Sequence, residues 1–315
     1  MTNLLTGSSL SAVDIKRLLA TARAFAQTTA TGKAPPHLLS GQTVALMFFE
    51  NSTRTRLSFE TAVRRLGGSS LGFSSGGSSV QKGESLIDTA LNIKAMGVHA
   101  MVIRHSSSGS PALVAQAVKT SVINAGDGFH EHPTQGLLDA YTLEDRLGDL
   151  QGKRVVILGD VLHSRVARSN LHILSRLGAQ VTVCGPPTWI PPISPELKIR
   201  TAIHPDEVLR DADAVMTLRI QLERQGLAQI PSLAEYREFW GLTAERIRLL
   251  KPGTIILHPG PVNRGVEMDS EVADSENSVI LDQVQNGIYV RMAVLASVCN
   301  PDGLERWLLG EGHHV

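Results

Sequence analysis

The chain has 315 residues, and its 30 lysines and arginines balance its 30 aspartates and glutamates, so the formal net charge is zero. This length favours two domains of ordinary size, and the balanced charge gives no general reason to expect a nucleic acid or a membrane as partner. With only two cysteines, no signal-peptide pattern and no apolar run near the ~20 residues of a membrane span, we expect a cytoplasmic protein.

Helices and strands are predicted to alternate through the first half of the chain. Apolar spacing predicts a helix over 9–26, with Ser11 as its N-cap and Asp14 in the capping-box position. A buried strand over 42–49 leads directly into a helix from about 53 to 66. The further elements expected here are a strand at 70–73, a helix at 85–96, a strand at 99–103, a helix at 111–119, a strand at 120–124 and a helix from Pro133 to about 146.

The same alternation resumes in the second half. The strands expected are 154–158, 180–184, 213–218 and 254–257. The helices expected are 164–177, 232–239, 243–250 and one that begins near 280, and the PPTWIPP segment at 186–192 is predicted to be a rigid loop. Strand-helix alternation in both halves predicts parallel sheets covered by helices, with a domain boundary near the helix at 133–148.

Polar clusters follow the predicted strands. Ligands of open parallel sheets bind beyond the carboxyl ends of the strands. A single arginine after a strand is most often a solvated surface residue, but six such clusters indicate one anion-binding crevice between two sheets. The clusters are Arg54 with Arg56, Arg104 with His105, His130 with His132 and Gln135, Asp160 with His163 and Arg165, Arg219 with Gln221 and Arg224, and the run His258–Pro261.

The segment Ser52-Thr53-Arg54-Thr55 suits a phosphate group. A helix N-terminus presents unpaired backbone N–H groups and partial positive charge, to which hydroxyls and a guanidinium add donors. The alternative is a simple helix cap made by Ser52 or Thr53. A cap does not explain Arg54 in the first turn, where a cation opposes the helix dipole. The Walker spacing GxxxxGK[ST] is absent.

Other signals are weaker when each is taken alone. Lys82 in the loop GGSSVQKGE is either a second cation for the same anion or an exposed loop lysine. His132 and Gln135 begin a helix and are as well explained by capping as by function. His130-x-His132 is a weak metal pattern, and neither a nucleophile elbow nor GxGxxG after a strand occurs.

Taken together, the sequence resembles the transcarbamoylase family, and within it the catalytic chains of aspartate carbamoyltransferases, over nearly its whole length. The resemblance rests on motifs in the same order and at similar spacing. These are STRTR at 52–56, KGES at 82–85, Arg104-His105, NAGDG at 124–128, HPTQ at 132–135, Arg165 after Gly159-Asp160, Arg219-x-Gln221 with Glu223-Arg224, and HPGP at 258–261. Many members of the family carry Leu where this chain has Gly260.

The resemblance implies a fold and a reaction. It implies an α/β protein with a carbamoyl-phosphate-binding domain at 1–140 plus about 285–315, to which the C-terminal helix returns, and an aspartate-binding domain at 141–284. It implies carbamoyl transfer from carbamoyl phosphate to the α-amino group of L-aspartate, an early step of pyrimidine biosynthesis. No metal or organic cofactor is implied.

The resemblance also implies roles for named residues. Carbamoyl phosphate is bound by Ser52, Thr53, Arg54, Thr55, Ser78, Arg104, His132, Gln135, Pro259 and Gly260. Aspartate is bound by Lys82, Arg165, Arg219 and Gln221. Catalysis is assigned to Arg54, Thr55, Lys82, Arg104, His132 and Gln135.

Two alternatives and an assembly stay open at this point. The chain could carbamoylate another amine such as ornithine, although it lacks the HCLP and SMG signatures of that relative, or serve as a non-catalytic scaffold. In the family the active site is shared between subunits of a homotrimer, with Ser78 and Lys82 entering from the neighbour. Dihydroorotase is a further partner that the HPGPVNRG stretch suggests.

Overall fold

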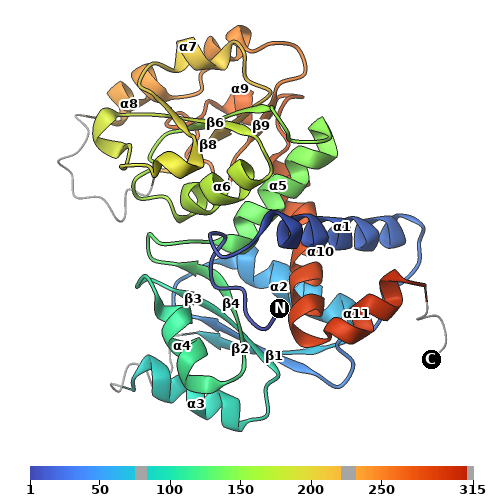
Figure 1. The fold of residues 1–315 in the computed structure, drawn as a ribbon. Coiled ribbons are helices and arrows are strands. Elements are labelled where there is room, and N and C mark those ends of the chain that lie inside the picture. The colour runs from blue at the N-terminus through green and yellow to red at the C-terminus, as the bar shows by residue number, and fades with distance from the viewer. Residues whose placement is uncertain (75–83, 221–231, 311–315) are drawn as a thin grey trace. The chain divides into compact units, whose positions relative to one another are not determined.

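The computed structural model describes residues 1–74, 84–220 and 232–310, which form two compact units. Unit 1 comprises Met1–Leu138 with Val284–Val315, and unit 2 comprises Asp139–Gln283. Each unit holds one parallel sheet with helices packed against it (Figure 1). The predicted fold class, two parallel-sheet domains flanked by helices, is therefore confirmed.

Unit 1 is built on a four-stranded sheet in the order β2-β1-β3-β4. Its strands are β1 (Thr43–Phe48), β2 (Ser69–Ser74), β3 (Ala100–His105) and β4 (Ser121–Asp127). Its helices are α1 (Ala12–Ala30), α2 (Thr53–Arg65), α3 (Leu86–Ala95), α4 (Ser110–Val118), the start of α5 (Pro133–Leu147), most of α10 (Ile280–Cys299) and α11 (Pro301–Leu308). The strand order reverses between β1 and β3, and in open parallel sheets this switch point is where ligands bind.

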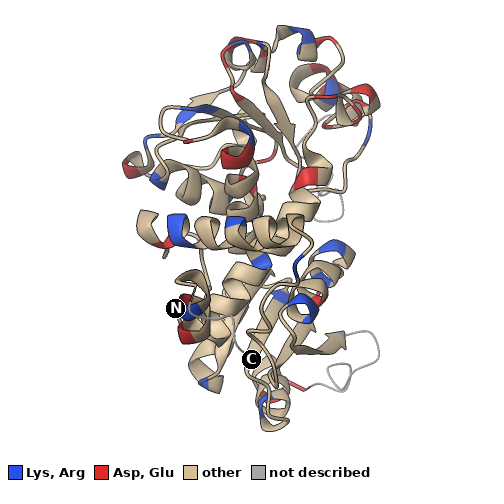
Figure 2. Ribbon diagram, turned by 90° about the vertical axis from the view of Figure 1, so that its right-hand side faces the viewer, with Lys and Arg blue, Asp and Glu red and all other residues tan. Residues whose placement is uncertain are grey.

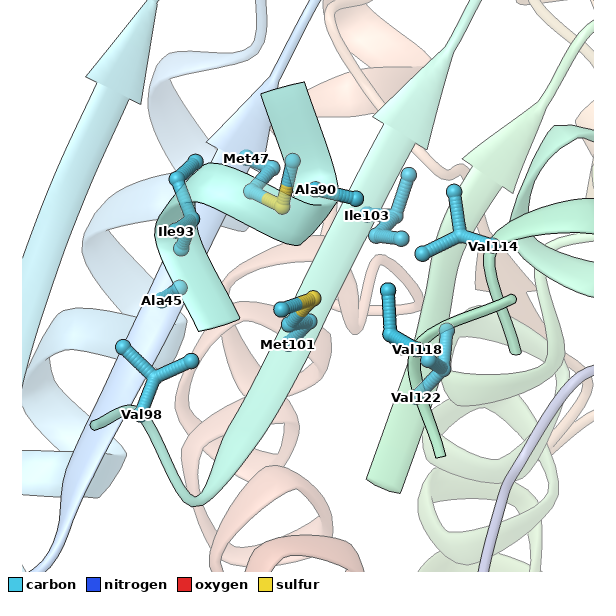
Figure 3. Close-up of a cluster of buried hydrophobic side chains, with 10 residues drawn as sticks. All are labelled: Ala45, Met47, Ala90, Ile93, Val98, Met101, Ile103, Val114, Val118 and Val122. Atoms are coloured by element: carbon cyan, nitrogen blue, oxygen red, sulfur yellow. The ribbon is translucent and has the colours of Figure 1, made fainter. Parts of the chain in front are cut away.

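Alternating side chains of these strands form an apolar layer beneath α3 and α4. Figure 3 shows Ala45, Met47, Met101 and Ile103 of β1 and β3 facing the two helices. The helices contribute Ala90, Ile93, Val114 and Val118, all buried. Burial of each large apolar side chain stabilises the fold by about 1.5–3 kcal/mol. This packing holds β1 and β3 in place, and with them the strand ends that carry the candidate site.

Unit 2 is built on a five-stranded sheet in the order β7-β6-β5-β8-β9. Its strands are β5 (Arg154–Leu158), β6 (Gln180–Cys184), β7 (Arg200–Ala202), β8 (Ala214–Thr217) and β9 (Ile255–Leu257). Its helices are α6 (Arg165–Arg176), α7 (Pro205–Leu209), α8 (Leu233–Trp240) and α9 (Ser270–Ala273), with 3-10 turns at Pro187–Trp189, Pro195–Leu197 and Arg246–Leu249. Here the order reverses between β5 and β8, which makes their carboxyl ends the expected ligand position.

The C-terminal helices belong to unit 1, as the sequence predicted. The ring of Trp307 in α11 stacks on Phe25 of α1 with 4.6 Å between centroids. In α10, Arg291 donates to the Ser58 hydroxyl of α2 at 2.9 Å. These contacts fix the returning end of the chain to the helices of the N-terminal part.

Several predicted elements were wrong in type or extent. Residues 243–250 do not form an α-helix but end in the 3-10 turn Arg246–Leu249, and the PPTWIPP loop contains the 3-10 turn Pro187–Trp189. Arg104 and His105 do not follow a strand but are the last residues of β3. The strand predicted at 120–124 continues to Asp127, because hydrogen bonds to β3 extend past a bulge near His105.

The first residues of the chain also join the sheet of unit 1, which the sequence did not predict. Leu4 pairs in parallel with Ile123 of β4, with its N–H donating to the Val122 carbonyl at 3.0 Å. The side chain of Asn3 accepts from the Val122 N–H at 2.8 Å. This segment therefore covers the exposed edge that β4 would otherwise present.

Charges of both signs are interspersed over the helices and loops of the described chain (Figure 2). This matches the neutral composition and places no strongly one-signed region in the view shown. None of the described helices combines the length and the apolar character that crossing a membrane demands.

The capping box at the start of α1 was predicted and is present. The Asp14 N–H donates to the Ser11 hydroxyl oxygen at 3.1 Å, and the Ser11 N–H donates to the Asp14 carboxylate at 3.0 Å. The hydrogen bonds from Ser11 lower the pKa of Asp14 below its usual value.

Loss of this cap gives a stability prediction. Ser11→Ala should lower the free energy of unfolding by about 1 kcal/mol, because the Asp14 N–H at the helix start loses the hydroxyl that accepts its hydrogen bond. Denaturant unfolding measures the change, with Lys16→Ala, an exposed position of the same helix, as the control. Equal stability of Ser11→Ala and the parent chain would contradict the prediction.

Candidate active site

The phosphate-suited segment lies between β1 and α2, at the switch point of the unit 1 sheet. Ser52 occupies the N-cap position of α2 with extended backbone, yet its side chain makes no capping hydrogen bond. The first turn contains no acidic residue, whereas it contains Arg54. The Ser52 side chain therefore does not act as a simple helix cap. Backbone N–H donors and the positive end of the helix dipole thus lie together at the start of α2.

The residues of this segment differ in exposure. Thr55 is buried, while Thr53 and Arg54 are exposed. Arg56 forms an ion pair with Glu60 at 2.9 Å. Its guanidinium also lies against Gly72 of β2, where an added Cβ would come within 2.9 Å of Nη2. Arg56 therefore braces α2 against the sheet, whereas the exposed Arg54 lies in the first turn of the helix.

Arg104 reaches the same switch point from the end of β3. Its Nη2 pairs with the Glu50 carboxylate at 3.0 Å, and its Nη1 donates to the Ala125 carbonyl at 3.4 Å. The Phe49 N–H donates to the Arg104 carbonyl at 2.9 Å, so the ends of β1 and β3 are tied together. This arrangement holds a guanidinium beside the start of the segment that leads into α2.

His105, its neighbour, has a structural role. Its Nδ1 accepts the Ser107 N–H at 2.9 Å and lies 3.0 Å from the Ser110 hydroxyl at the start of α4. Burial lowers the pKa of His105 below its usual value. We therefore regard Arg104 and not His105 as the candidate for ligand contact.

The loop after β4 brings His132 and Gln135 to the start of α5. Both side chains are buried, with exposed fractions of 3% and 8%. The His132 Nδ1 lies 3.5 Å from the Thr134 hydroxyl, the outer limit of a hydrogen bond. A buried imidazole and a buried amide at a strand end form a preorganised pair for a polar ligand group.

Two buried carboxylates shape this loop, and sequence reasoning missed both as structural residues. Asp127 accepts the N–H groups of Gly109 at 2.7 Å and Glu131 at 3.1 Å. Glu131 accepts the N–H groups of Gly7 at 2.6 Å and Ser8 at 3.2 Å. The residue next to His132 is thus anchored to the N-terminal segment.

In unit 2, Arg165 begins α6 at the switch point of the five-stranded sheet. It follows the turn Gly159-Asp160, in which Gly159 has a φ of +124° that favours glycine. Ser164 caps the helix by accepting the Ala167 N–H at 3.1 Å. The Arg165 side chain is only 4% exposed, so it is a buried guanidinium at the carboxyl end of β5.

The other predicted residues of unit 2 lie at the ends of β8 and β9. Arg219 is half-buried, two residues after β8. Pro259 and Gly260 follow β9 and are half-buried, and Gly260 adopts a φ of +63°. That left-handed conformation is one that glycine adopts without strain. Ser78, Lys82 and Gln221 lie outside the described residues.

Within the described ranges, no three His, Cys, Asp or Glu side chains gather as a set that could hold a metal ion. The positions that gather at strand ends are cationic or neutral donors. Such a donor set suits an anionic organic ligand better than a cation.

Comparison with known proteins agrees with this donor set. The family model for the aspartate/ornithine carbamoyltransferase carbamoyl-P binding domain matches residues 2–145, and the model for the Asp/Orn binding domain matches residues 151–298. The chain belongs to the aspartate/ornithine carbamoyltransferase family.

Curated members of this family match most of the chain. The aspartate carbamoyltransferase catalytic subunit of Myxococcus xanthus is 57% identical over 268 residues, which cover 85% of this chain and 90% of that protein. The corresponding subunit of Syntrophotalea carbinolica is 49% identical over 296 residues, covering 94% and 95%.

Solved structures of the family match the fold. Aspartate transcarbamoylase from Trypanosoma cruzi in complex with N-(phosphonacetyl)-L-aspartic acid has a TM-score of 0.86 and 31% identity, covering 94% of this chain and 95% of that one. Ornithine carbamoyltransferase from Pyrococcus furiosus has a TM-score of 0.84 and 30% identity, covering 94% and 96%. The fold alone therefore does not separate the two acceptors of this family.

Proposed function

We propose that this chain transfers the carbamoyl group of carbamoyl phosphate to the α-amino group of L-aspartate, giving N-carbamoyl-L-aspartate and phosphate, an early step of pyrimidine biosynthesis. The observation that carries the proposal is the pairing of the transcarbamoylase motifs with arginines at the strand ends of unit 2. Relatives that are 49–57% identical over most of the chain carry the aspartate carbamoyltransferase name, which supports it.

Carbamoyl phosphate would be held mainly by unit 1. Ser52, Thr53, Arg54 and Thr55 present hydroxyls, backbone N–H groups and a guanidinium to the phosphate, whose charge grows as it leaves. Thr55, Arg104 and His132 direct donors at the carbonyl oxygen. A neutral imidazole suffices for His132, because one ring nitrogen is then a donor.

The carbamoyl amide needs acceptors rather than donors. The Gln135 side-chain oxygen and the backbone carbonyls of Pro259 and Gly260 supply them in the proposal. Glycine keeps a carbonyl at position 260, so the departure from the leucine of many family members leaves this role intact.

The acceptor amine would be selected through its carboxylates. Arg165 and Arg219, with Gln221, match the two carboxylates of aspartate, because each guanidinium can bind a carboxylate through two parallel hydrogen bonds. Ornithine carries one carboxylate and a cation at its other end, so buried Arg165 beside that cation would be repulsive.

The chemical step needs no cofactor and no covalent intermediate. The neutral α-amino group attacks the carbonyl carbon of carbamoyl phosphate, and the tetrahedral intermediate collapses with loss of phosphate. The departing phosphate can take the amine proton, so a protein base is not required. Catalysis then rests on orientation and on donors placed where negative charge develops.

The proposal extends to assembly and location. We propose a homotrimer in which Ser78 and Lys82 enter the active site from the neighbouring subunit, a point supported by the family resemblance. A cytoplasmic location is supported by two cysteines that are both free thiols. We also propose association with dihydroorotase, on the basis of the HPGPVNRG stretch at 258–265.

An acceptor assay tests the proposed function. Purified chain with carbamoyl phosphate should release phosphate and form a carbamoylated product with L-aspartate, at a rate at least about a hundredfold above that with ornithine, since a mispaired buried charge costs several kcal/mol. The control omits the amine and measures spontaneous breakdown of carbamoyl phosphate. Turnover with ornithine but not with aspartate would show that ornithine, not aspartate, is the acceptor. Turnover with neither amine would favour the non-catalytic scaffold alternative.

A further inference from the structure

The loop His258–Pro261 is held at its first residue by buried side chains. The His258 Nδ1 accepts the Gly260 N–H at 2.7 Å, and its Nε2 lies 3.1 Å from Oε1 of Glu267. The His258 and Glu267 side chains are 0% and 1% exposed. Together with Gln283, whose side-chain oxygen accepts the His258 N–H at 2.9 Å, these residues form what we call the His258 clamp.

The hydrogen bonds define the ring's protonation. Because Nδ1 accepts from the Gly260 N–H, a neutral imidazole carries its proton on Nε2 and donates it to Glu267. The same Glu267 oxygen also accepts the Asn263 N–H at 2.6 Å. One carboxylate oxygen therefore fixes both the histidine ring and the far side of the loop.

The other end of the clamp continues into α5. The Gln283 side-chain nitrogen donates to Asp139 at 2.8 Å, and Asp139 is buried in α5. Asp139 lies one helical turn after Gln135 in the same helix. The clamp thus ties the loop after β9 to the part of α5 that belongs to unit 2.

Burying the Glu267 carboxylate costs desolvation free energy, which indicates that the residue has a specific role. A carboxylate buried to this degree is unfavourable unless its hydrogen bonds recover the desolvation free energy. Within the described chain, the second oxygen of Glu267 has no hydrogen-bond partner. Gly260, in contrast, is the residue with the greatest intrinsic backbone freedom, so the loop needs an external restraint to keep one conformation.

We infer that Glu267 is a positioning residue for carbamoyl transfer. Acting through His258, it fixes the Gly260 N–H and with it the direction of the Pro259 carbonyl, which lies in the same peptide plane. This carbonyl then meets the carbamoyl amide without reorganising when the substrate binds. The inference rests on the proposed function, because it takes from it the ligand of the loop.

Variants at Glu267 test the inference by steady-state kinetics. Glu267→Ala should lower kcat/KM for carbamoyl phosphate by about 30-fold, because a misdirected ligand group costs up to about a hundredfold, while KM for the amine changes by less than about threefold. Glu267→Gln keeps an acceptor oxygen for His258 and should stay within about fivefold of the parent. Glu271→Ala, an exposed position four residues on, is the matched control and should be unchanged.

Three results would contradict a positioning role for Glu267. A folded Glu267→Ala chain with kcat/KM for carbamoyl phosphate within about twofold of the parent overturns the inference. So does an equal loss for both substrates that tracks the unfolded fraction measured by circular dichroism. If Glu267→Ala does not fold, Glu267→Asp decides, because it keeps the charge but withdraws it from His258. Parent-like kinetics of that variant overturn the inference.

Failure of the proposed function would be seen separately. It appears in the parent chain, as absence of turnover with aspartate. If the parent uses ornithine, the same variants are compared with ornithine. If it turns over neither amine, calorimetry of carbamoyl phosphate binding replaces the rate, and equal affinity of the parent and Glu267→Ala, or no binding to the parent, overturns the inference.

Discussion

Replacement of Arg54 by alanine is expected to reduce kcat for carbamoyl transfer by about a thousandfold, because loss of one donor to a developing anion already costs about a hundredfold to a thousandfold. Arg54 stands in the first turn of α2, where it adds a positive charge to the helix end that favours anions. Release of phosphate from carbamoyl phosphate in the presence of aspartate measures the effect. Because Arg54 is exposed, its removal should leave the fold intact.

Arg56 provides the matched control for this variant. It is the same residue type in the same helix, and its guanidinium is paired with Glu60 and lies over Gly72. Arg56→Ala should keep kcat within about threefold and lower stability by at most about 1 kcal/mol, as for a partly exposed ion pair. Full activity of Arg54→Ala, or an equal loss in both variants, would reject the assignment of the phosphate to Arg54.

Much of the fold follows from local signals. The strand at 154–158 and the strand at 180–184 have the predicted bounds, because each is a short apolar run between polar turns. The Ser11–Asp14 box begins α1 as expected. Where hydrophobic pattern and turn chemistry agree, sequence alone is sufficient.

The remaining elements depend on tertiary contacts that no local pattern contains. β7 (Arg200–Ala202) is a three-residue edge strand whose side chains are partly exposed, so it lacks an apolar run. The Leu4 segment forms a β-bridge only because β4 offers its edge. At 243–250 the helical spacing is real, but the segment ends in a 3-10 turn in which the Arg246 side chain donates to the Gly241 carbonyl.

In the candidate site, too, some features follow from local sequence and others from tertiary contacts. Switch-point geometry brings Arg54 and Arg104 to neighbouring strand ends, which the strand-end rule anticipated. The carboxylates Glu50, Glu131 and Glu267 were not anticipated, because their partners are an arginine or backbone amides far away in sequence or in a turn. An acidic residue beside a predicted binding motif gives no sequence signal that its side chain will be buried.

Replacement of Arg165 by glutamine is expected to raise KM for aspartate far more than it changes KM for carbamoyl phosphate. A lost bidentate contact to a carboxylate is worth about 2–4 kcal/mol, which corresponds to about a 30-fold to thousandfold loss in kcat/KM for aspartate. Glutamine is preferred to alanine because Arg165 is buried at the start of α6 and a cavity there would cost stability.

Initial rates with each substrate varied in turn measure the two KM values. Arg200→Gln, an exposed position in β7 of the same unit, controls for the loss of a positive charge and should behave as the parent chain. Unfolding temperatures of both variants show whether the change in KM is independent of stability. An Arg165→Gln chain that binds aspartate normally, or that loses affinity for carbamoyl phosphate instead, would remove Arg165 from the acceptor site and leave Arg219 and Gln221 as the candidates for recognising the dicarboxylate.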